Sequence, residues 1–359
     1  MKVSKKLKFI DAARGYAILG VIMIHTLKIV QPTNIYLSIL ANKGKYGVQL
    51  FFLASAFTLF LSLDRRTEKN SRNFFIRRFF RIAPMYYMGI LFYLFVFKEV
   101  SNSYNGNLIY CEDSVISFFN IFSNFIFINS TNPSWCSTIV PGGATISVEM
   151  IFYLIVPFLY SKINTLDSAV KFLLASIFLS FILSILLNNF LVTECNELKN
   201  IFMYSYFFKQ LPVFSLGIIA FFIIVKEDFK LKKNTFLFLF LLVFIYAIWN
   251  MIITKFLLVS FTALLFLIAL SKTHSKILVN DFISFIGKVS YSAYLIHFIV
   301  IYYLDMVLLR FNFPLKFVPY FIITVVVTLL ASNIFRHLVE NPFIRVGKYF
   351  IKKPNENIL

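Results

Sequence analysis

The chain is poor in charged residues and in cysteine. Only 14% of its 359 residues are charged, and it contains 16 acidic residues and 3 cysteines. Three scattered cysteines, Cys111, Cys136 and Cys195, are too few for a disulfide framework or a cysteine-based metal cluster, and we expect no metal site. All three fall in predicted outer loops, where one pair could bridge in an oxidising compartment; three unpaired thiols are the alternative.

The shortage of acidic residues leaves a net charge of +19. The sequence nevertheless has no base-stacking module, no basic stripe and no Gly-rich RNA-binding run, so we expect no nucleic acid as a partner. Instead, 59% of the residues are hydrophobic, and the mean hydropathy of +0.80 lies far outside the range of soluble domains. These values predict a polytopic membrane protein, in contact with membrane lipids, whose positive charges lie in loops and report its orientation.

Ten apolar segments are candidate membrane-spanning helices, for which about 20 apolar residues suffice. They are Phe9–Val30, Tyr46–Leu63, Ile82–Phe97, Ser147–Tyr160, Val170–Phe190, Ile201–Val225, Thr235–Met251, Phe256–Ser271, Val289–Leu308 and Phe317–Phe335. An eleventh apolar stretch, Val115–Ile128, is short and contains Asn120 and Asn124, and we expect it to be a re-entrant or outer-surface segment. The predicted fold is therefore an all-α bundle of about ten transmembrane helices with one such short segment.

The distribution of Lys and Arg predicts the orientation of the bundle. If the stretch Val115–Ile128 does not cross the membrane, 25 of the 35 Lys and Arg residues fall on the inner side and nine on the outer side, while Arg14 lies within the first span. The positive-inside rule then places both termini in the cytoplasm. No polar tail or linker of domain size is present, so residues 1–359 are predicted to form a single membrane domain.

The first predicted span contains two ionisable residues, Arg14 and His25, in DAARGYAILGVIMIHT. A separation of eleven residues returns to within about 20° of the same helix face, roughly 16 Å along the axis. Ionisable side chains in lipid normally face a bundle interior or a polar cavity. Arg14 could alternatively be a snorkelling anchor, and His25 a buried imidazole satisfied by a neighbouring helix. Otherwise His25 is a natural general base for a hydroxyl acceptor.

Two further arginines, Arg78 and Arg81 in RRFFRIAP, are three residues apart. They would share a face if the third helix begins early, and paired guanidinium groups at the cytoplasmic mouth of a bundle suit a polyphosphate ligand. The alternative is that they only signal orientation and touch anionic lipid.

The remaining candidates are Glu149 in PGGATISVEM and His297 with Tyr291 and Tyr294 in KVSYSAYLIHF. Glu149 either caps a helix N-terminus or faces the cavity of His25, where it would orient the imidazole or an acceptor hydroxyl. His297 and the two tyrosines are either structural or part of the same polar centre, and the residues alone do not rank these two options.

Six motifs in order resemble the acyltransferase-3 family of membrane acyltransferases. They are FIDAARG with its following His25, GVQLFFLASAF, RRFFRIAP, PGGATISVEMIFYLIVPFL, GKVSYSAYLIHF and FRHLVENPF, and they cover nearly the whole chain. The resemblance implies a ten-helix bundle that takes an acyl group, commonly acetyl from acetyl-CoA, and delivers it to a carbohydrate hydroxyl. The chain departs from the family pattern at Gln49, Ala56 and Ala144, where Asp, Gly and Trp are common, which bears on the acceptor and not on the class.

The resemblance also implies roles for the candidate residues. His25 would be the essential histidine and Arg14 its partner, Arg78 and Arg81 the Arg-x-x-Arg pair that we expect to bind CoA phosphates, and Glu149 the acid before the Phe-Tyr motif. The acyl arm would pass Arg14, which could neutralise phosphate or polarise the carbonyl. A covalent relay through a tyrosine or His25 remains open.

The predicted function is a membrane O-acyltransferase that moves acetyl from cytoplasmic acetyl-CoA, its co-substrate, to a hydroxyl of a surface polysaccharide or its lipid-linked precursor, such as O-antigen or capsule. The predicted location is the bacterial cytoplasmic (inner) membrane. No fused soluble transferase domain is expected, so the acceptor meets the membrane domain itself or a separate protein. A transporter or flippase for a glycan or lipid, and a non-catalytic partner in envelope assembly, are the alternatives. The oligomeric state is left open, a homodimer included.

Overall fold

The computed structural model describes residues 8–65, 71–95, 116–191, 196–228, 252–273 and 275–351. All regular structure within these residues is helical, which agrees with the predicted all-α class. Seven helical segments of this part are long and apolar enough to cross a membrane: Lys8–Ile29, Ile35–Asp64, Gly143–Lys162, Leu166–Phe190, Leu198–Lys226, Ser290–Arg310 and Phe317–Tyr349. The chain therefore has the character of a multi-pass membrane protein. The predicted span Thr235–Met251 lies outside the described residues.

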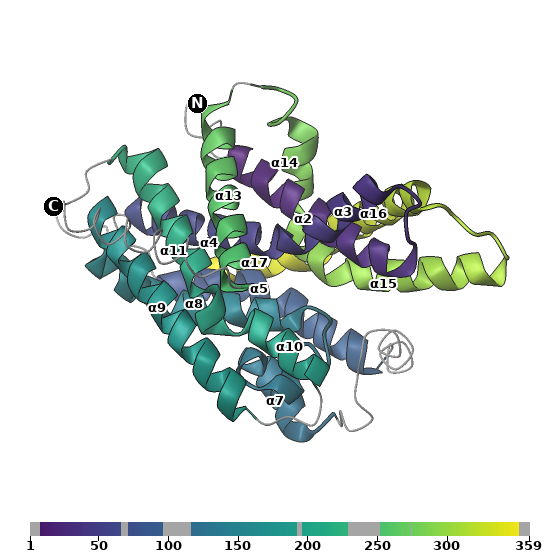
Figure 1. The fold of residues 1–359 in the computed structure, drawn as a ribbon, viewed down its shortest axis with the longest axis horizontal. Coiled ribbons are helices and arrows are strands. Elements are labelled where there is room, and N and C mark those ends of the chain that lie inside the picture. The colour runs from purple at the N-terminus through teal and green to yellow at the C-terminus, as the bar shows by residue number, and fades with distance from the viewer. Residues whose placement is uncertain are drawn as a thin grey trace.

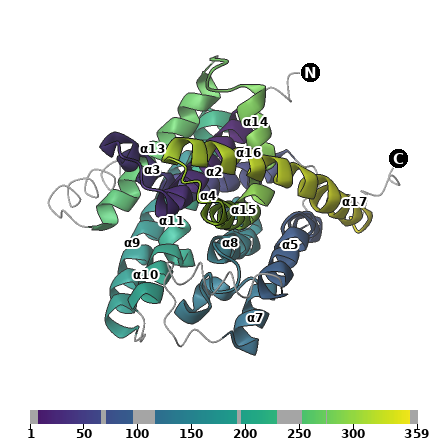
Figure 2. The ribbon, with the colours of Figure 1, turned by 90° about the vertical axis from the view of Figure 1, so that its right-hand side faces the viewer.

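Helix α2 (Lys8–Ile29) lies near the middle of the bundle (Figures 1 and 2). Its neighbours are α4 (Gly47–Asp64), α13 (Ile252–Lys272), α14 (Asp281–Lys288), α15 (Ser290–Arg310) and α16 (Phe317–Phe335). The approach to α14 is close: a Cβ built on Gly287 would lie 1.7 Å from the Asp11 carbonyl oxygen, and one on Gly15 would lie 2.4 Å from that of Ile283. Only glycine permits this backbone contact, which is typical of helix pairs in membranes. The contact fixes the rotation of α2 and hence the direction in which Arg14 points.

Helix α5 (Ser71–Phe95) begins eleven residues before the apolar segment Ile82–Phe97 from which it was predicted. Arg78 and Arg81 are therefore helical and three residues apart on one side of α5, as the early start requires. Pro84 lies inside this helix and has no N–H group to donate to the preceding turn. The start of α15 is hydrogen-bonded to α5 near Pro84, because the Tyr291 hydroxyl donates to the Ile82 carbonyl oxygen at 2.7 Å.

The stretch Val115–Ile128 contributes only the eight-residue helix α7 (Phe118–Phe125). Eight residues span about 12 Å, too little to cross a hydrocarbon core of about 30 Å. Its buried side is polar, since Asn120 and Asn124 are buried while Phe118 and Phe122 are exposed. This inverted arrangement suits a segment in contact with lipid. Helix α7 alone is too short to be an eleventh span, and its predicted place as a re-entrant or outer-surface segment stays a prediction.

The predicted span Ile201–Val225 is interrupted at Tyr206, between α10 (Asn196–Ser205) and α11 (Phe207–Phe221). The Gln210 side chain donates to the Tyr204 carbonyl oxygen at 2.6 Å and thereby satisfies a group at the broken end of α10. The remaining helices are α3 (Ile35–Lys43), α8 (Gly143–Lys162), α9 (Leu166–Phe190) and α17 (Asn341–Tyr349). Helix α17 packs on α5 at the edge of the bundle (Figure 2).

Candidate active site

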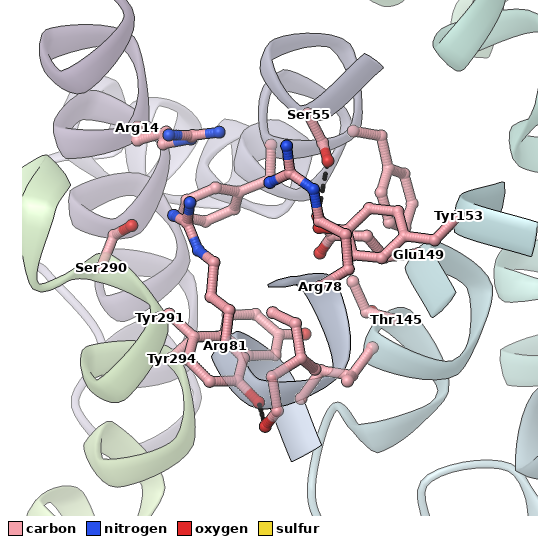
Figure 3. A pocket seen from close by; sticks show the side chains of 14 residues that line it. Arg14, Ser55, Arg78, Arg81, Thr145, Glu149, Tyr153, Ser290, Tyr291 and Tyr294 are labelled. Carbon is pink, nitrogen blue, oxygen red and sulfur yellow. Dashed lines mark hydrogen bonds between the residues drawn. The ribbon is translucent and has the colours of Figure 1, made fainter. Parts of the chain in front are cut away.

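A cavity opens where α2, α4, α5, α8 and α15 converge. Its volume is about 630 Å³ including the open mouth, and Figure 3 shows the side chains around it. The lining residues are Arg14, Phe51, Phe52, Ser55, Arg78, Arg81, Ile82, Thr145, Ile146, Glu149, Tyr153, Ser290, Tyr291 and Tyr294. Five helices that are distant in sequence thus bring six of the predicted site residues together.

The charge of the cavity favours an anion. Three guanidinium groups face one carboxylate, that of Glu149, which gives a formal net charge of +2. The guanidinium groups of Arg78 and Arg81 reach from α5 into the cavity (Figure 3). Within the residues that the structure describes, neither Arg14 nor Arg81 has a carboxylate oxygen within 4.0 Å. A site inside a membrane bundle whose lining carries more positive than negative charge is suited to a phosphate-bearing ligand.

Two of these arginines are held by specific contacts. Arg14 Nη2 donates to the Thr58 hydroxyl at 3.0 Å, and that hydroxyl donates in turn to the Ala54 carbonyl oxygen at 2.9 Å. The Arg78 guanidinium lies over the rings of Phe74 and Tyr153, at 5.5 and 5.8 Å from their centroids, as in cation–π contacts. Arg14 therefore faces the bundle interior, and both guanidinium groups are oriented before any ligand binds.

Glu149 lies in the second turn of α8, because this helix begins at Gly143, four residues before the predicted Ser147. It is therefore beyond the first turn, where a carboxylate would cap the helix. Its carboxylate accepts hydrogen bonds from the Ser55 hydroxyl and the Tyr153 hydroxyl, both at 2.5 Å. These contacts place Glu149 among the arginines, and its predicted role in orienting His25 stays a prediction.

The start of α8 also positions Tyr294. Gly142, which precedes the helix, has a φ of +74°, a left-handed conformation that favours glycine. The Tyr294 hydroxyl donates to the Gly142 carbonyl oxygen at 3.3 Å, and a Cβ on Gly142 would lie 2.6 Å from that hydroxyl. Tyr294 can occupy its place beside the cavity only because residue 142 has no side chain.

His25 and His297 form a second group that is not part of the cavity lining. Their ring centroids are 5.3 Å apart, and the Phe298 ring lies 4.4 Å from His25 and 4.1 Å from His297. Tyr294, which does line the cavity, has its ring centroid 5.8 Å from that of His297. The predicted polar centre is thus divided into an arginine cavity and a histidine pair, with Tyr294 in contact with both.

Five polar residues of the site were not foreseen: Ser55, Thr58, Thr145, Tyr153 and Ser290. Tyr153 follows Glu149 by four residues, so it lies on the same helix face, and this spacing is a signal that sequence reasoning had available. Ser55 and Thr58 sit on α4 within GVQLFFLASAFTLF, and nothing in that apolar run distinguishes them from hydroxyl groups that merely bond their own helix backbone.

Comparison with known protein families decides the class. A family model described as an acyltransferase domain matches residues 7–336. The chain belongs to the acyltransferase-3 family. The matched region contains every cavity residue of this acyltransferase and both members of its histidine pair. Comparison with curated proteins and with solved structures gives no match. The protein is therefore a membrane acyltransferase, and its donor and acceptor have to be argued from the site.

Proposed function

We propose that the protein is an O-acyltransferase that takes acetyl from cytoplasmic acetyl-CoA and transfers it to a hydroxyl group of a bacterial surface polysaccharide or its lipid-linked precursor, such as O-antigen or capsule. The observation that carries the proposal is the cavity with a formal charge of +2 inside the bundle of a membrane acyltransferase. An acyl-CoA is an acyl donor that also carries phosphates, so one ligand satisfies both the reaction class and the charge. Family membership favours this function over a transporter or flippase.

The donor would bind through its phosphates to Arg78 and Arg81. Guanidinium groups bind phosphate oxygens through paired N–H donors in a fixed planar geometry, and these two extend from neighbouring turns of α5. Arg14 lies on α2 and is held by Thr58. It would contact either a further phosphate or the thioester carbonyl, whose oxygen gains negative charge in the transition state.

His25 would be the general base. It removes the proton of the acceptor hydroxyl as the hydroxyl oxygen attacks the thioester carbonyl carbon; the C–S bond then breaks, and the CoA thiolate takes up the proton. For this step the acyl end of the donor has to pass Tyr294, which lies between the cavity and the histidine pair. Glu149, bonded to Ser55 and Tyr153, would balance the arginine charge at the donor end.

The proposal is tested by acetyl transfer in membrane vesicles that contain the native envelope glycan, with label followed from acetyl-CoA into the glycan. The wild-type protein should transfer label, and His25→Ala should not, although it is inserted at the same level. The double variant Arg78→Ala, Arg81→Ala should bind CoA more weakly. Full transfer by the His25 variant would remove its assignment as base, and unchanged CoA affinity in the double variant would reduce the two arginines to orientation signals.

A further inference from the structure

We infer that His297 is a positioning residue for His25: its Nε2 accepts a hydrogen bond from His25 Nδ1–H, directly or through one water molecule. The inference rests on the proposed function, in which His25 is the general base. It is independent of the donor cavity, because it concerns only the histidine pair and the groups packed around it.

The hydrogen bonding of His297 fixes which of its nitrogens carries the proton. Its Nδ1 lies 3.0 Å from the Ala293 carbonyl oxygen. A carbonyl oxygen can only accept, so Nδ1 must be the donor, and Nε2 of the neutral ring is left with a lone pair. His297 is fully buried, and its Nε2 has no hydrogen-bond partner within the described residues. An acceptor of this kind in a buried position requires a donor.

His25 offers the complementary group. Its Nδ1 is also buried and also without a partner among the residues that the structure describes. The two rings are neighbours at 5.3 Å between centroids, and Phe298 packs against both of them, which limits their rotation. A donor at His25 Nδ1 and an acceptor at His297 Nε2 satisfy each other, whether they meet directly or share a bridging water.

This pairing would decide the tautomer of the base. With its proton on Nδ1, His25 carries its lone pair on Nε2, and Nε2 is then the atom that removes the proton of the acceptor hydroxyl. His297 gains and loses no proton in the reaction. It holds the ring, and it stabilises the imidazolium that forms, in the way that a third group orients the base of a catalytic pair.

Two amide variants separate positioning from a structural role. In His297→Gln, the side-chain amide reaches the place of the imidazole Nε2 and can present an oxygen there, so this variant should retain the acceptor. In His297→Asn, the shorter amide overlaps the place of Nδ1 and can keep the bond to the Ala293 carbonyl, but nothing is left at the Nε2 position. His297→Asn should therefore lower kcat for acetyl transfer by about 10- to 100-fold, less than the roughly 10²- to 10⁴-fold that a general base itself contributes, with KM for acetyl-CoA unchanged. His297→Gln should recover most of the activity.

The control is His337→Asn. Its Nδ1 lies 2.8 Å from the Asn333 carbonyl oxygen, the same bond four residues back along the helix, but His337 is exposed and apart from the cavity lining. Transfer and CoA release are measured in vesicles with native glycan, alongside thermal melting of each purified variant. Wild-type kcat in His297→Asn would overturn the inference, as would equal loss in His297→Asn and His297→Gln. If the wild-type protein transfers no label from acetyl-CoA to the glycan, the proposed function fails. If His25→Ala keeps full transfer, the assignment of His25 as base fails, and if His25→Ala is inactive while His297→Asn is fully active, only this inference fails.

Discussion

The charge balance of the arginine cavity predicts that two substitutions of opposite charge effect shift the affinity for CoA in opposite directions. Arg81→Gln changes the formal charge of the cavity from +2 to +1, whereas Glu149→Gln changes it from +2 to +3. Glu149→Gln keeps the shape of the native side chain, Arg81→Gln keeps a polar but shorter one, and the two substitutions lie on different helices, α8 and α5. If the cavity binds the phosphates of CoA, the first variant must bind CoA more weakly and the second more tightly.

The size of each effect follows from the contacts. Loss of a hydrogen bond to a charged group amounts to about 1.5–3 kcal/mol, so Arg81→Gln should raise the Kd for CoA roughly 10- to 160-fold. Removing the Glu149 charge relieves repulsion of about 2 kcal/mol from a phosphate at about 8 Å, with an effective dielectric constant of about 20. Salt and residual water reduce this value, and we expect Glu149→Gln to bind CoA about tenfold more tightly.

The assay is calorimetric titration of purified protein in detergent with CoA, at low and high salt. The matched control is Lys171→Gln, which removes the charge of an exposed lysine that pairs with the buried Asp167 on α9, away from the cavity. High salt should compress the difference between the two cavity variants and leave the control at wild-type affinity. If Arg81→Gln and Glu149→Gln shift the Kd in the same direction, or if Lys171→Gln shifts it as much as Arg81→Gln does, the cavity is not a phosphate site.

Three other substitutions test the structure around the site. Burial raises the pKa of the Cys136 thiol to about 11. A variant that keeps Cys136 as its only cysteine should therefore resist maleimide at neutral pH, react faster as the pH rises toward that value, and react fully once unfolded. Rapid labelling of the folded protein at neutral pH, measured by mass spectrometry, would contradict the burial. Gly142→Ala should lose about 1–3 kcal/mol of stability, from its positive φ and from contact with Tyr294, together with transfer activity; an unchanged melting temperature would refute this. Gln49 is fully buried, and neither polar atom of its side-chain amide has a hydrogen-bond partner within the described residues. Gln49→Leu should therefore stabilise the protein by about 1 kcal/mol, measured by thermal melting. A lower melting temperature would show that the amide does have a hydrogen-bond partner in the native protein.

The early start of α5 shows what hydropathy can and cannot predict. An apolar window detects Ile82–Phe97, because the preceding residues include four arginines between Ser71 and Ile82 and look like a loop. The spacing of Arg78 and Arg81 nevertheless predicted a shared face if the helix began early, and the structure confirms the early start. Composition indicates which residues contact lipid, but a helix continues beyond the apolar segment where its polar side chains line a cavity.

The division of the predicted polar centre shows a different limit. Helical periodicity predicted that Arg14 and His25 share a face of α2, but it does not state which helix lies opposite each of them. Arg14 meets Thr58 of α4, whereas His25 meets His297 and Phe298 of α15. These partners depend on how the helices pack, and that packing rests on close backbone contacts such as the one at Gly287. A single sequence gives the faces of its helices and leaves their pairing undetermined.

The packing of α15 against α2 explains why the site has an arginine cavity at one end and the histidine pair at the other. On α15, Ser290, Tyr294 and His297 follow one another at intervals of four and three residues, so they form one stripe that leads from the cavity to the histidine pair over about 10 Å. On α2, which packs against α15, the stripe from Arg14 to His25 also leads from the cavity to the histidine pair and covers about 16 Å. A ligand that uses both ends must be long, carry negative charge at one end and be reactive at the other. A free acetyl phosphate is too short to do so. An acyl-CoA has its phosphates and its thioester at opposite ends of a flexible arm, so the distance between the arginines and the imidazoles is itself an argument for the donor.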